Sequence, residues 1–271
     1  MRLGLIGLGK FGSNYLKIKV DGIEITETCS STRDYHELID SDLDGVIIAT
    51  PTSLHYEMAE AAIAAHKPFI VEKPLTGHGS ESQKLLEIYN KNSVLALINF
   101  VYLFDPCFQA LQKNLNKVGK LQKVEFYGLQ SPIRTDGTTV IQDWGPHPLY
   151  IMQSLMGKPN KISAKKLDGD NIELNLKFSN KEGKAIIGWT YPTRERKIVA
   201  VGERGKIVYD ATANQKLILE TNTTTPLEYE QTTSLANLLL HFAACIRGTK
   251  SPIATLAMGA NIDQQIDSIQ L

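Results

Sequence analysis

The sequence predicts an α/β domain built on a parallel sheet, followed by an α+β domain with a mostly antiparallel sheet. Two observations carry this prediction. Over residues 1–101, short apolar runs typical of strands alternate with helical segments, the order that gives parallel strands joined by right-handed helical crossovers. Farther along, short strands follow one another with little helix between them, which favours antiparallel pairing. We expect the two domains at residues 1–118 and 119–271.

The chain opens with a strand, a glycine-rich loop and a helix. Residues 3–6 form a short apolar run, the loop follows as Gly7-Leu8-Gly9-Lys10-Phe11-Gly12, and residues 13–19 have helical character. In such a loop the first glycine allows the tight turn, the second lets a pyrophosphate approach the backbone, and the third lets the helix pack closely. Backbone N–H groups and the helix dipole would then meet the phosphates. A glycine-rich turn that binds nothing is the alternative, and the position between strand and helix favours the dinucleotide site.

Further strands and helices complete the first domain. Alternating apolar and polar residues predict a half-buried strand, and continuous apolar runs predict strands covered on both faces. Ser80 and Gln83 form a capping-box pattern at the start of a helix. The predicted elements are strands at residues 23–28, 46–49, 69–71 and 94–101, and helices at residues 55–65 and from residue 80.

The connection between the second and third strands is short. Residues 29–45 suffice for one short helical crossover but not for an added strand. We therefore predict a shortened, Rossmann-like parallel sheet that lacks one edge strand, with the strand at residues 23–28 at the edge. On that side, the pocket for the adenosine of a dinucleotide would be less enclosed.

A helix at residues 106–116 leads into the second domain. The strand at residues 172–178 has apolar residues at every second position and polar residues between them, the pattern of an open-faced sheet with one packed face. The polar face is either solvated or a subunit interface. Strands are predicted at residues 123–129, 161–167, 172–178, 184–191, 197–201, 205–210 and 216–220, and closing helices at residues 234–247 and 256–269.

Composition excludes several classes of protein. Lys plus Arg and Asp plus Glu number 29 each, and this balance gives no reason to expect a nucleic-acid partner. No apolar run reaches the roughly 18 residues of a membrane span, and Lys10 interrupts the apolar N-terminal stretch, which argues against a signal peptide. The cysteines, Cys29, Cys107 and Cys245, are far apart and odd in number, so we expect no disulfide framework and a cytoplasmic protein.

Lys73 is the first candidate for chemistry. It follows the buried strand at residues 69–71 at its carboxyl end, where the ligand sites of parallel sheets lie. A lysine partly withdrawn from water can shuttle a proton. The alternative is a surface lysine that pairs with Glu72.

Asp143 and His147 are the second candidates. The stretch Asp143-Trp144-Gly145-Pro146-His147-Pro148 leads into an apolar helix, and its prolines place the helix start here. Asp143 is then expected near the cap and His147 in the first turn, where the dipole favours a neutral imidazole that can hydrogen-bond a substrate hydroxyl. A simple cap with a structural histidine is the alternative. Two such side chains are too few for a zinc site.

Other catalytic patterns are misplaced or do not occur. Tyr15 and Lys19 match a Tyr-x-x-x-Lys pair, but they lie in the helix after the glycine loop, so we interpret them as helix packing. The sequence contains neither a GxSxG nucleophile elbow nor a GxxxxGK[ST] phosphate loop.

Three groups of residues occur in one order along the chain. They are the glycine loop, then the stretch Ala-Thr-Pro-Thr-Ser-Leu-His at 49–55 with the tripeptide Glu72-Lys73-Pro74, and then the stretch from Asp143 to His147. Together they resemble the glucose–fructose oxidoreductase and inositol dehydrogenase (Gfo/Idh/MocA) family over essentially the whole chain. The resemblance implies an NAD(P)-dependent oxidoreductase of sugars, sugar derivatives or cyclitols. It also implies a nucleotide domain joined to an open-faced sheet domain that forms homodimers or homotetramers.

The resemblance implies roles for single residues. Lys73 would hydrogen-bond the reacting hydroxyl beside the nicotinamide, and Asp143 would position the substrate or the neighbouring base. His147 would act as general acid/base, a role that Lys73 shares or takes in some members of the family. Arg134 lies in a stretch similar to that of relatives from polysaccharide and nucleotide-sugar loci and would meet an anionic substrate group, unless it is a solvated loop residue. The cofactor would be held by Gly7, Gly9, Lys10, Phe11, Gly12, Thr50, Pro51, His55, Glu72 and Lys73.

The end of the second strand departs from the family pattern. NAD enzymes place an acidic residue there to hold the ribose 2′-hydroxyl, whereas this chain reads Cys29-Ser30-Ser31-Thr32-Arg33. Ser30, Ser31 and Arg33 suit a 2′-phosphate better, which predicts NADP in preference to NAD. Asp34 is the nearest acidic residue, with the start of the next helix as its other role. Two other functions stay open: a nucleotide-binding sensor or scaffold without turnover, and a glycosidase that uses tightly held NAD.

Overall fold

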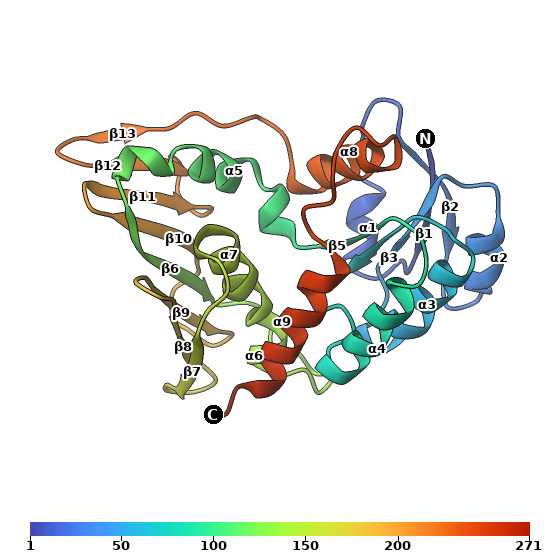
Figure 1. The fold of residues 1–271 in the computed structure, drawn as a ribbon, viewed down its shortest axis with the longest axis horizontal. Coiled ribbons are helices and arrows are strands. Elements are labelled where there is room, and N and C mark those ends of the chain that lie inside the picture. Colours follow the sequence, from blue (N-terminus) through green and yellow to red (C-terminus); the bar gives the residue numbers. More distant parts are fainter. The chain divides into compact units, whose positions relative to one another are not determined.

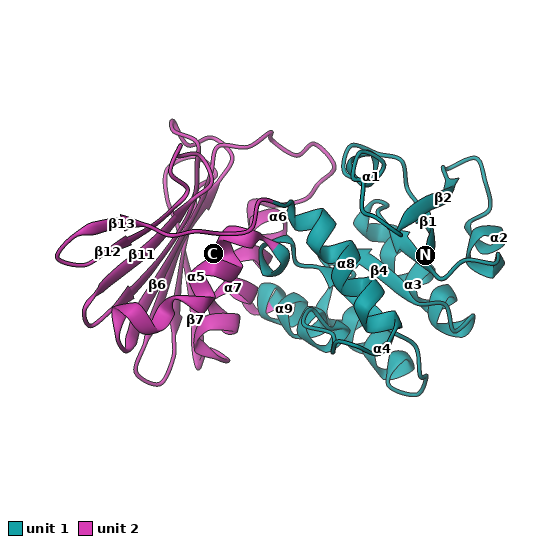
Figure 2. Cartoon of the chain, turned by 90° about the horizontal axis from the view of Figure 1, so that it is seen from above, with its two compact units in different colours: residues 1–104, 232–267 teal, residues 105–231, 268–271 magenta.

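The computed structural model describes residues 1–271, and the chain divides into two compact units. Unit 1 consists of residues 1–104 and 232–267, and unit 2 consists of residues 105–231 and 268–271 (Figure 2). The chain therefore leaves unit 1 and returns to it near its C-terminus.

The two closing helices explain why this division differs from the boundary expected at residues 118 and 119. Helix α8 (Ser234–Ile246) packs on the short helix η2 (Val101–Phe104), and the Asn237 side-chain amide donates to the Phe104 carbonyl at 3.0 Å. Helix α9 (Leu256–Ser268) accepts hydrogen bonds from the loop after the fourth strand through Asp263. Both helices thus group with the first sheet rather than with the second.

Unit 1 contains a five-stranded parallel sheet in the order β2-β1-β3-β4-β5 (Figure 1). The central strands β3 and β4 and the strand β5 are buried along their whole length, as their continuous apolar runs predict. β2 lies at the edge, and only one helix fills the crossover to β3, so the prediction of a shortened sheet is confirmed. The elements are β1 (Arg2–Ile6), α1 (Gly12–Tyr15), β2 (Glu24–Cys29), α2 (Tyr35–Asp40), β3 (Gly45–Ile48), η1 (Thr52–Leu54), α3 (His55–Ala64), β4 (Phe69–Glu72), α4 (Gly79–Tyr89) and β5 (Ala96–Asn99).

Helix α1 is a single turn, so the predicted helix at residues 13–19 is wrong in length. The chain leaves the helix after Tyr15 because tight turns follow. The N–H groups of Lys17 and Ile18 bond to carbonyls three residues back, at 3.2 Å each, and Val20 pairs with Ile23 across the next turn. These turns bring the chain into β2 and leave no length for a second helical turn.

Helix α4 begins one residue earlier than its predicted capping box and is not capped by it. Its N-cap is His78, without a side-chain cap, and the Gly79 N–H donates to the Asp267 carboxylate at 2.7 Å. Asp263, one turn earlier in α9, accepts from the N–H groups of Thr76 and Gly77 at 3.0 and 3.2 Å. The helix start is therefore stabilised by carboxylates from the far end of the chain, which local sequence could not indicate.

Unit 2 contains an eight-stranded sheet in the order β13-β12-β11-β10-β6-β9-β8-β7. All neighbouring pairs are antiparallel except β6 and β9, which run parallel. The mostly antiparallel sheet was predicted, whereas the short edge strand β13 was not. The elements are α5 (Pro106–Lys113), η3 (Leu115–Val118), β6 (Leu121–Leu129), α6 (Val140–Trp144), α7 (Pro146–Met156), β7 (Lys161–Lys166), β8 (Ile172–Lys177), β9 (Glu182–Gly188), β10 (Glu195–Gly202), β11 (Gly205–Asp210), β12 (Leu217–Glu220) and β13 (Thr224–Pro226).

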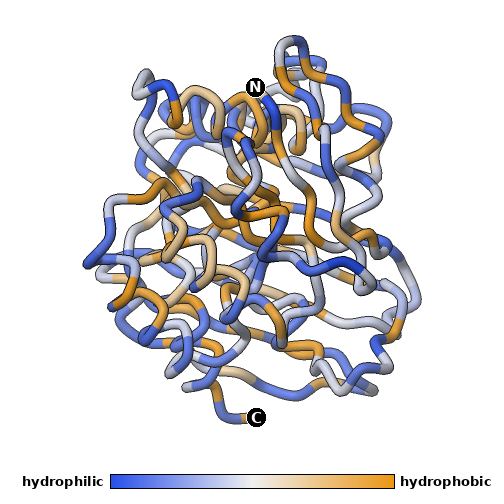
Figure 3. Tube along the Cα trace, turned by 90° about the vertical axis from the view of Figure 1, so that its right-hand side faces the viewer, coloured by the Kyte–Doolittle hydropathy of each residue, from blue (hydrophilic) through white to orange (hydrophobic).

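The two faces of this sheet differ as the alternating pattern predicts. Leu174 and Leu176 in β8 are buried, and a Cβ on Gly183 in β9 would lie 2.5 Å from the Met152 sulfur, so α7 packs on this face. The other face carries cross-strand ion pairs such as Lys184 with Glu173 at 2.7 Å. Along the whole chain, hydrophobic stretches are short and interrupted by hydrophilic ones (Figure 3), and no helix has the length and apolar character needed to cross a membrane.

Candidate active site

The three glycines of the loop after β1 have three different surroundings. Gly7 has φ +97°, and a Cβ there would lie 2.5 Å from the Ala49 carbonyl oxygen. A Cβ on Gly12 would lie 2.0 Å from the Gly7 carbonyl oxygen, whereas a Cβ on Gly9 would meet no atom within 4 Å. The fold of the loop therefore requires Gly7 and Gly12. Gly9 leaves open space after the carboxyl end of β1, the place at which the glycine motif predicts a pyrophosphate.

Lys10 and Phe11 in the same loop are exposed, Phe11 at 44%. The Phe11 ring meets the Tyr15 ring edge-on, with 6.2 Å between the centroids. Because α1 is a single turn, its dipole contributes little, and anion binding would depend on the N–H groups of the loop and on the Lys10 ammonium.

The end of β2 lies beside this loop, because the Gly7 N–H donates to the Cys29 carbonyl at 2.9 Å. Arg33 pairs with two carboxylates here. Its Nη2 lies 3.0 Å from Glu27, and its Nε lies 3.8 Å from Glu37. A 2′-phosphate at this position would compete with both carboxylates for the guanidinium.

The remaining residues of this turn bond locally. Ser30 Oγ lies 2.8 Å from Thr32 Oγ1, and Ser31 is exposed. Asp34 caps α2 by accepting from the His36 N–H at 2.9 Å. Of the two roles considered for Asp34, the structure therefore supports the helix start.

His55 lies between the loops that follow β3 and β4. It is 1% exposed, with Nδ1 at 2.9 Å from the Pro74 carbonyl oxygen and Nε2 at 3.1 Å from the Thr50 carbonyl oxygen. Burial lowers the pKa of this imidazole, and the two carbonyl oxygens act against that shift. His55 thus joins the backbone of the Thr50–Pro51 stretch to the backbone next to Lys73, and so positions residues expected at the cofactor.

Glu72, directly before the half-buried Lys73, is part of a buried network. The Tyr15 hydroxyl donates to Glu72 Oε1 at 2.6 Å, and the Asn99 amide donates to the same atom at 2.8 Å. Burial raises the pKa of Glu72 to about 7, while these two donors and the Lys73 ammonium lower it in part. The interpretation of Tyr15 as helix packing therefore missed its hydroxyl. The signal for Asn99 was a polar residue at the end of a buried strand.

Asp143 lies in unit 2, in helix α6 rather than at the cap of α7. The N-cap of α7 is Gly145, and α6 starts with a capping box between Thr139 and Gln142, a local pattern that could have revealed this helix. Asp143 Oδ2 accepts from the Trp189 indole N–H at 3.0 Å. Asp143 therefore lies just before the N-cap of α7, near the cap as expected, but in a helix of its own, and its partner Trp189 was not predicted.

His147 lies in the first turn of α7, as the prolines predict. It is 8% exposed, its Nδ1 lies 2.9 Å from the Tyr150 hydroxyl oxygen, and its ring centroid lies 5.2 Å from that of Trp144. The tyrosine and the indole together orient the imidazole.

Trp144 has contacts on several sides. Its indole N–H donates to Ser131 Oγ at 3.0 Å, and the Arg196 guanidinium lies 4.3 Å from the ring centroid, a cation–π arrangement. A Cβ on Gly128 would lie 2.5 Å from the indole, so the ring packs directly on β6. These contacts fix the junction of α6 and α7, next to Asp143 in α6 and His147 in α7.

Arg134 is near Asp143 within unit 2. Its Nη1 lies 4.0 Å from Asp143 Oδ1, and its Nη2 lies 2.5 Å from Asp136. The structure thus brings Arg134, Asp143 and His147 into one region of unit 2, whereas Lys73 and the glycine loop belong to unit 1.

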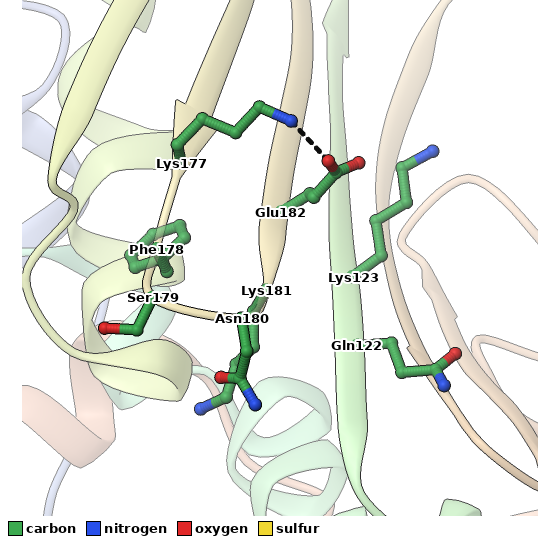
Figure 4. Close-up of a pocket in the computed structure, with 8 residues that line it drawn as sticks. All are labelled: Gln122, Lys123, Lys177, Phe178, Ser179, Asn180, Lys181 and Glu182. Atoms are coloured by element: carbon green, nitrogen blue, oxygen red, sulfur yellow. Dashed lines mark hydrogen bonds and ion pairs between the residues drawn. The ribbon is translucent and has the colours of Figure 1, made fainter.

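A separate depression of about 510 Å³ lies at the turn between β8 and β9 (Figure 4). Lys177 and Glu182 form an ion pair in it. Its lining residues are Gln122, Lys123, Lys177, Phe178, Ser179, Asn180, Lys181 and Glu182, and no predicted site residue is among them.

Comparison with known proteins supports the nucleotide-binding interpretation of unit 1. The family model GFO_IDH_MocA, described as an oxidoreductase family with an NAD-binding Rossmann fold, matches residues 19–100. A crystal structure of a provisionally named oxidoreductase from Magnetospirillum magnetotacticum MS-1 is similar over the whole chain, with a TM-score of 0.92 and 26% identity, covering 100% of this chain and 99% of that one. Residues 19–100 of this chain are thus similar to the Gfo/Idh/MocA oxidoreductases.

Two curated relatives of this chain are named dehydrogenases. Inositol 2-dehydrogenase from Salmonella typhimurium is 28% identical over 144 residues, which is 45% of this chain and 43% of that protein. Levoglucosan dehydrogenase from Pseudarthrobacter phenanthrenivorans is 34% identical over 121 residues, which is 44% of this chain and 28% of that protein. The matched part thus spans less than half of either relative.

Proposed function

We propose that this chain is an NAD(P)-dependent oxidoreductase that transfers hydride between a nicotinamide cofactor and a hydroxyl or keto carbon of a sugar, sugar derivative or nucleotide sugar. The observation that carries the proposal is the open space over Gly9, in a loop where Gly7 and Gly12 are sterically required. The match of residues 19–100 to an oxidoreductase family model and the relatives named as inositol and levoglucosan dehydrogenases support the same function.

The chain's own residues would bind and orient the dinucleotide, which when bound supplies or accepts the hydride. The N–H groups of the glycine loop and the Lys10 ammonium would hold the pyrophosphate, and Phe11 would cover it. Thr50 and Pro51, in the loop after β3, would flank the cofactor. His55 holds this loop in place through its contact with the Thr50 carbonyl. Glu72 would act on this site indirectly, because its carboxylate is buried and hydrogen-bonded.

Lys73 and His147 would take part in proton transfer. Lys73 would donate a hydrogen bond to the oxygen of the reacting hydroxyl, and His147 would take its proton in oxidation and return it in reduction. Tyr150, at 2.9 Å from His147 Nδ1, would hold the imidazole for that transfer. Asp143, anchored by the Trp189 indole at 3.0 Å, would position the substrate.

The substrate would carry an anionic group that meets Arg134. The guanidinium is 45% exposed, and Asp136 orients it from one side, so a second anion can approach it. This supports a phosphorylated, carboxylated or nucleotide-linked sugar among the sugar-like substrates of the family.

For the cofactor we propose NADP, with NAD as the alternative. The end of β2 carries Cys29 in place of the acidic residue that would hold a ribose 2′-hydroxyl, and Arg33 supplies a cation for the 2′-phosphate. The pairing of Arg33 with Glu27 and Glu37 would reduce this preference.

We further propose a cytoplasmic homodimer or homotetramer that associates through the open face of the eight-stranded sheet. The three cysteines are free thiols, which is compatible with a reducing compartment. Light scattering coupled to size-exclusion chromatography measures the oligomer, and a monomer would contradict the proposed assembly.

Titration with NADPH and NADH, followed by assays with cyclitols, sugars and nucleotide sugars, tests the proposed function. We expect saturable binding, turnover with one substrate class, and a loss of about 10²–10⁴-fold in kcat for Lys73→Ala or His147→Ala. Binding without turnover of any substrate would favour a sensor or scaffold. Glycosidic cleavage without net change of the cofactor would favour a glycosidase. Absence of dinucleotide binding would overturn the proposal.

A further inference from the structure

Three buried polar side chains join the helical turn after the glycine loop to the strand that leads to Lys73. Tyr15 ends α1, Glu72 ends β4 and Asn99 ends β5, where Asn99 is the register partner of Glu72. Their exposed fractions are 0, 7 and 1%. Besides the two bonds to Glu72, the Asn99 amide donates to the Tyr15 hydroxyl oxygen at 3.0 Å, so the three groups form a closed network.

The network is arranged around a carboxylate. Asn99 directs its amide N–H groups at Glu72 and Tyr15, although its own Oδ1 is buried without a hydrogen-bond partner. An orphaned acceptor is costly, and the charge that the donors stabilise on Glu72 accounts for this orientation. The groups that act on Glu72 are Tyr15 from α1, Asn99 from β5 and Lys73 in the adjoining loop. With a pKa of about 7, Glu72 changes its charge in the neutral range.

We propose that Tyr15 is a positioning residue that acts on Lys73 through Glu72. Its ring contacts Phe11 in the glycine loop, and its hydroxyl holds the carboxylate of the residue before Lys73. The loop expected to bind the dinucleotide and the lysine expected to meet the substrate are therefore joined by one side chain within unit 1. The inference rests on the proposed role of Lys73 and deepens it, because it makes the position of the lysine dependent on the charge of Glu72.

The variant Tyr15→Phe removes the hydroxyl and keeps the ring against Phe11. The matched control is Tyr56→Phe, which removes the hydroxyl that donates to Glu60 at 3.4 Å within α3 of the same unit. Glu72→Gln removes the titrating group. The measurement is the rate at which an N-hydroxysuccinimide ester acetylates the Lys73 amine, followed by mass spectrometry from pH 6 to 9 in protein without ligands.

We expect a plot of the wild-type acetylation rate against pH to change slope near pH 7, where Glu72 ionises, and we call this change of slope the bend. In Tyr15→Phe the bend moves up by about one pH unit, because a carboxylate that loses a hydrogen-bond donor titrates higher. The bend disappears in Glu72→Gln and is unchanged in Tyr56→Phe. A folded Tyr15→Phe protein with the wild-type profile would overturn the inference.

A second variant covers the case in which Tyr15→Phe does not fold. Asn99→Ala removes the other donor to Glu72 and is expected to move the bend in the same direction; an unmoved bend would again overturn the inference. The labelling needs neither dinucleotide nor substrate, so its outcome is independent of the proposed activity. A chain that binds no dinucleotide but shows the shifted bend would overturn the proposed function and leave the coupling of Tyr15 to Lys73 intact.

Discussion

Gly9 and Gly12 belong to one motif, yet single-residue geometry separates their roles. At Gly12 an added methyl would overlap the Gly7 carbonyl, which is backbone and cannot turn aside. At Gly9 it would point into space that no atom fills. Gly12 is thus required for folding, whereas Gly9 determines what the loop can bind.

Gly9→Val is therefore expected to change cofactor affinity, and Gly12→Ala is expected to change stability. Gly9→Val leaves the free energy of unfolding within about 0.5 kcal/mol of wild type and lowers NADPH affinity at least about tenfold, because the side chain occupies the pyrophosphate position. Gly12→Ala destabilises the protein by about 1–3 kcal/mol through overpacking. Urea denaturation and NADPH fluorescence titration measure the two quantities. Tight NADPH binding by Gly9→Val would contradict the assignment of this space.

The acidic partners of Arg33 give a prediction about cofactor choice. Glu27→Gln is expected to shift the ratio of NADPH to NADH affinity toward NADPH by up to about tenfold, because the 2′-phosphate loses a competitor for the guanidinium. Arg33→Ala is expected to shift the ratio toward NADH. Glu24→Gln, an exposed change on the same strand, is the control. The ratio is obtained from paired titrations, and equal ratios in all four proteins would rule out a role for Arg33.

Glu72 predicts a pH dependence of stability whose sign follows from its raised pKa. The folded state holds the proton up to about pH 7, whereas the unfolded chain releases it near the ordinary value of 4.5. The contribution of Glu72 to stability is therefore fully present below pH 4.5 and is lost as the pH rises to about 7, a change of ~3 kcal/mol. Urea denaturation from pH 4 to 8 should show wild type losing this amount relative to Glu72→Gln. Parallel curves would contradict the assigned pKa shift.

At the scale of elements, α9 acts as a cap for the loop after Lys73 and for the start of α4. Asp263 is 2% exposed and accepts three hydrogen bonds, from the N–H groups of Thr76 and Gly77 and from Ser82 Oγ at 2.6 Å. Asp267, one turn later, accepts from the Gly79 N–H. Two carboxylates one turn apart on α9 thus hold the loop before α4 and one of the N–H groups that α4 leaves open at its start.

Asp263→Asn is expected to lower the free energy of unfolding by about 1–3 kcal/mol, because all three donors bond to Oδ2 and a neutral amide oxygen accepts them more weakly than a carboxylate oxygen. Asp267→Asn affects only the hydrogen bond from the Gly79 N–H and should lower the free energy of unfolding by a smaller amount. Chemical denaturation of both variants measures the difference. Equal stability of Asp263→Asn and wild type would show that the loop does not depend on this cap.

Sequence patterns predicted the elements whose stability is local and missed those that depend on distant residues. The apolar runs of β3 and β4, the short crossover after β2 and the prolines that start α7 were sufficient signals. The capping of α4 by α9 and the partners of Tyr15 were not predictable, because each depends on segments far away in the sequence. The early end of α1 follows from local turns that the sequence patterns did not reveal. At the candidate site, residue types were inferred from motifs, whereas Trp189 and Asn99 became visible only through their contacts.

At the scale of the whole molecule, unit 1 is assembled from two distant segments. Residues 232–267 follow all of the eight-stranded sheet, yet they supply α8, which packs on η2, and Asp263 of α9. The N-terminal part of unit 1 thus lacks part of its own core until the chain is nearly complete.

A fragment of residues 1–118 is accordingly expected not to unfold cooperatively. It keeps all five strands of the first sheet but lacks α8 and α9, so apolar surface near η2 and the N–H groups at the start of α4 lose their partners. Joining residues 1–104 to 232–267 through a flexible linker should restore a cooperative transition. Thermal unfolding by circular dichroism distinguishes the two, and a cooperative transition of the shorter fragment would contradict the prediction.

The shortened first sheet has a consequence for solubility. β2 pairs only with β1, so every second backbone carbonyl along it points away from the sheet and could accept a strand from another molecule. Arg33 occupies one such acceptor, donating to the Thr28 carbonyl at 3.2 Å, while its pairing with Glu27 places a charged pair along the same border. The Arg33 guanidinium, which we considered for cofactor binding, therefore also protects the exposed edge of β2 against intermolecular β-pairing. A variant that loses Arg33 would be more prone to aggregate.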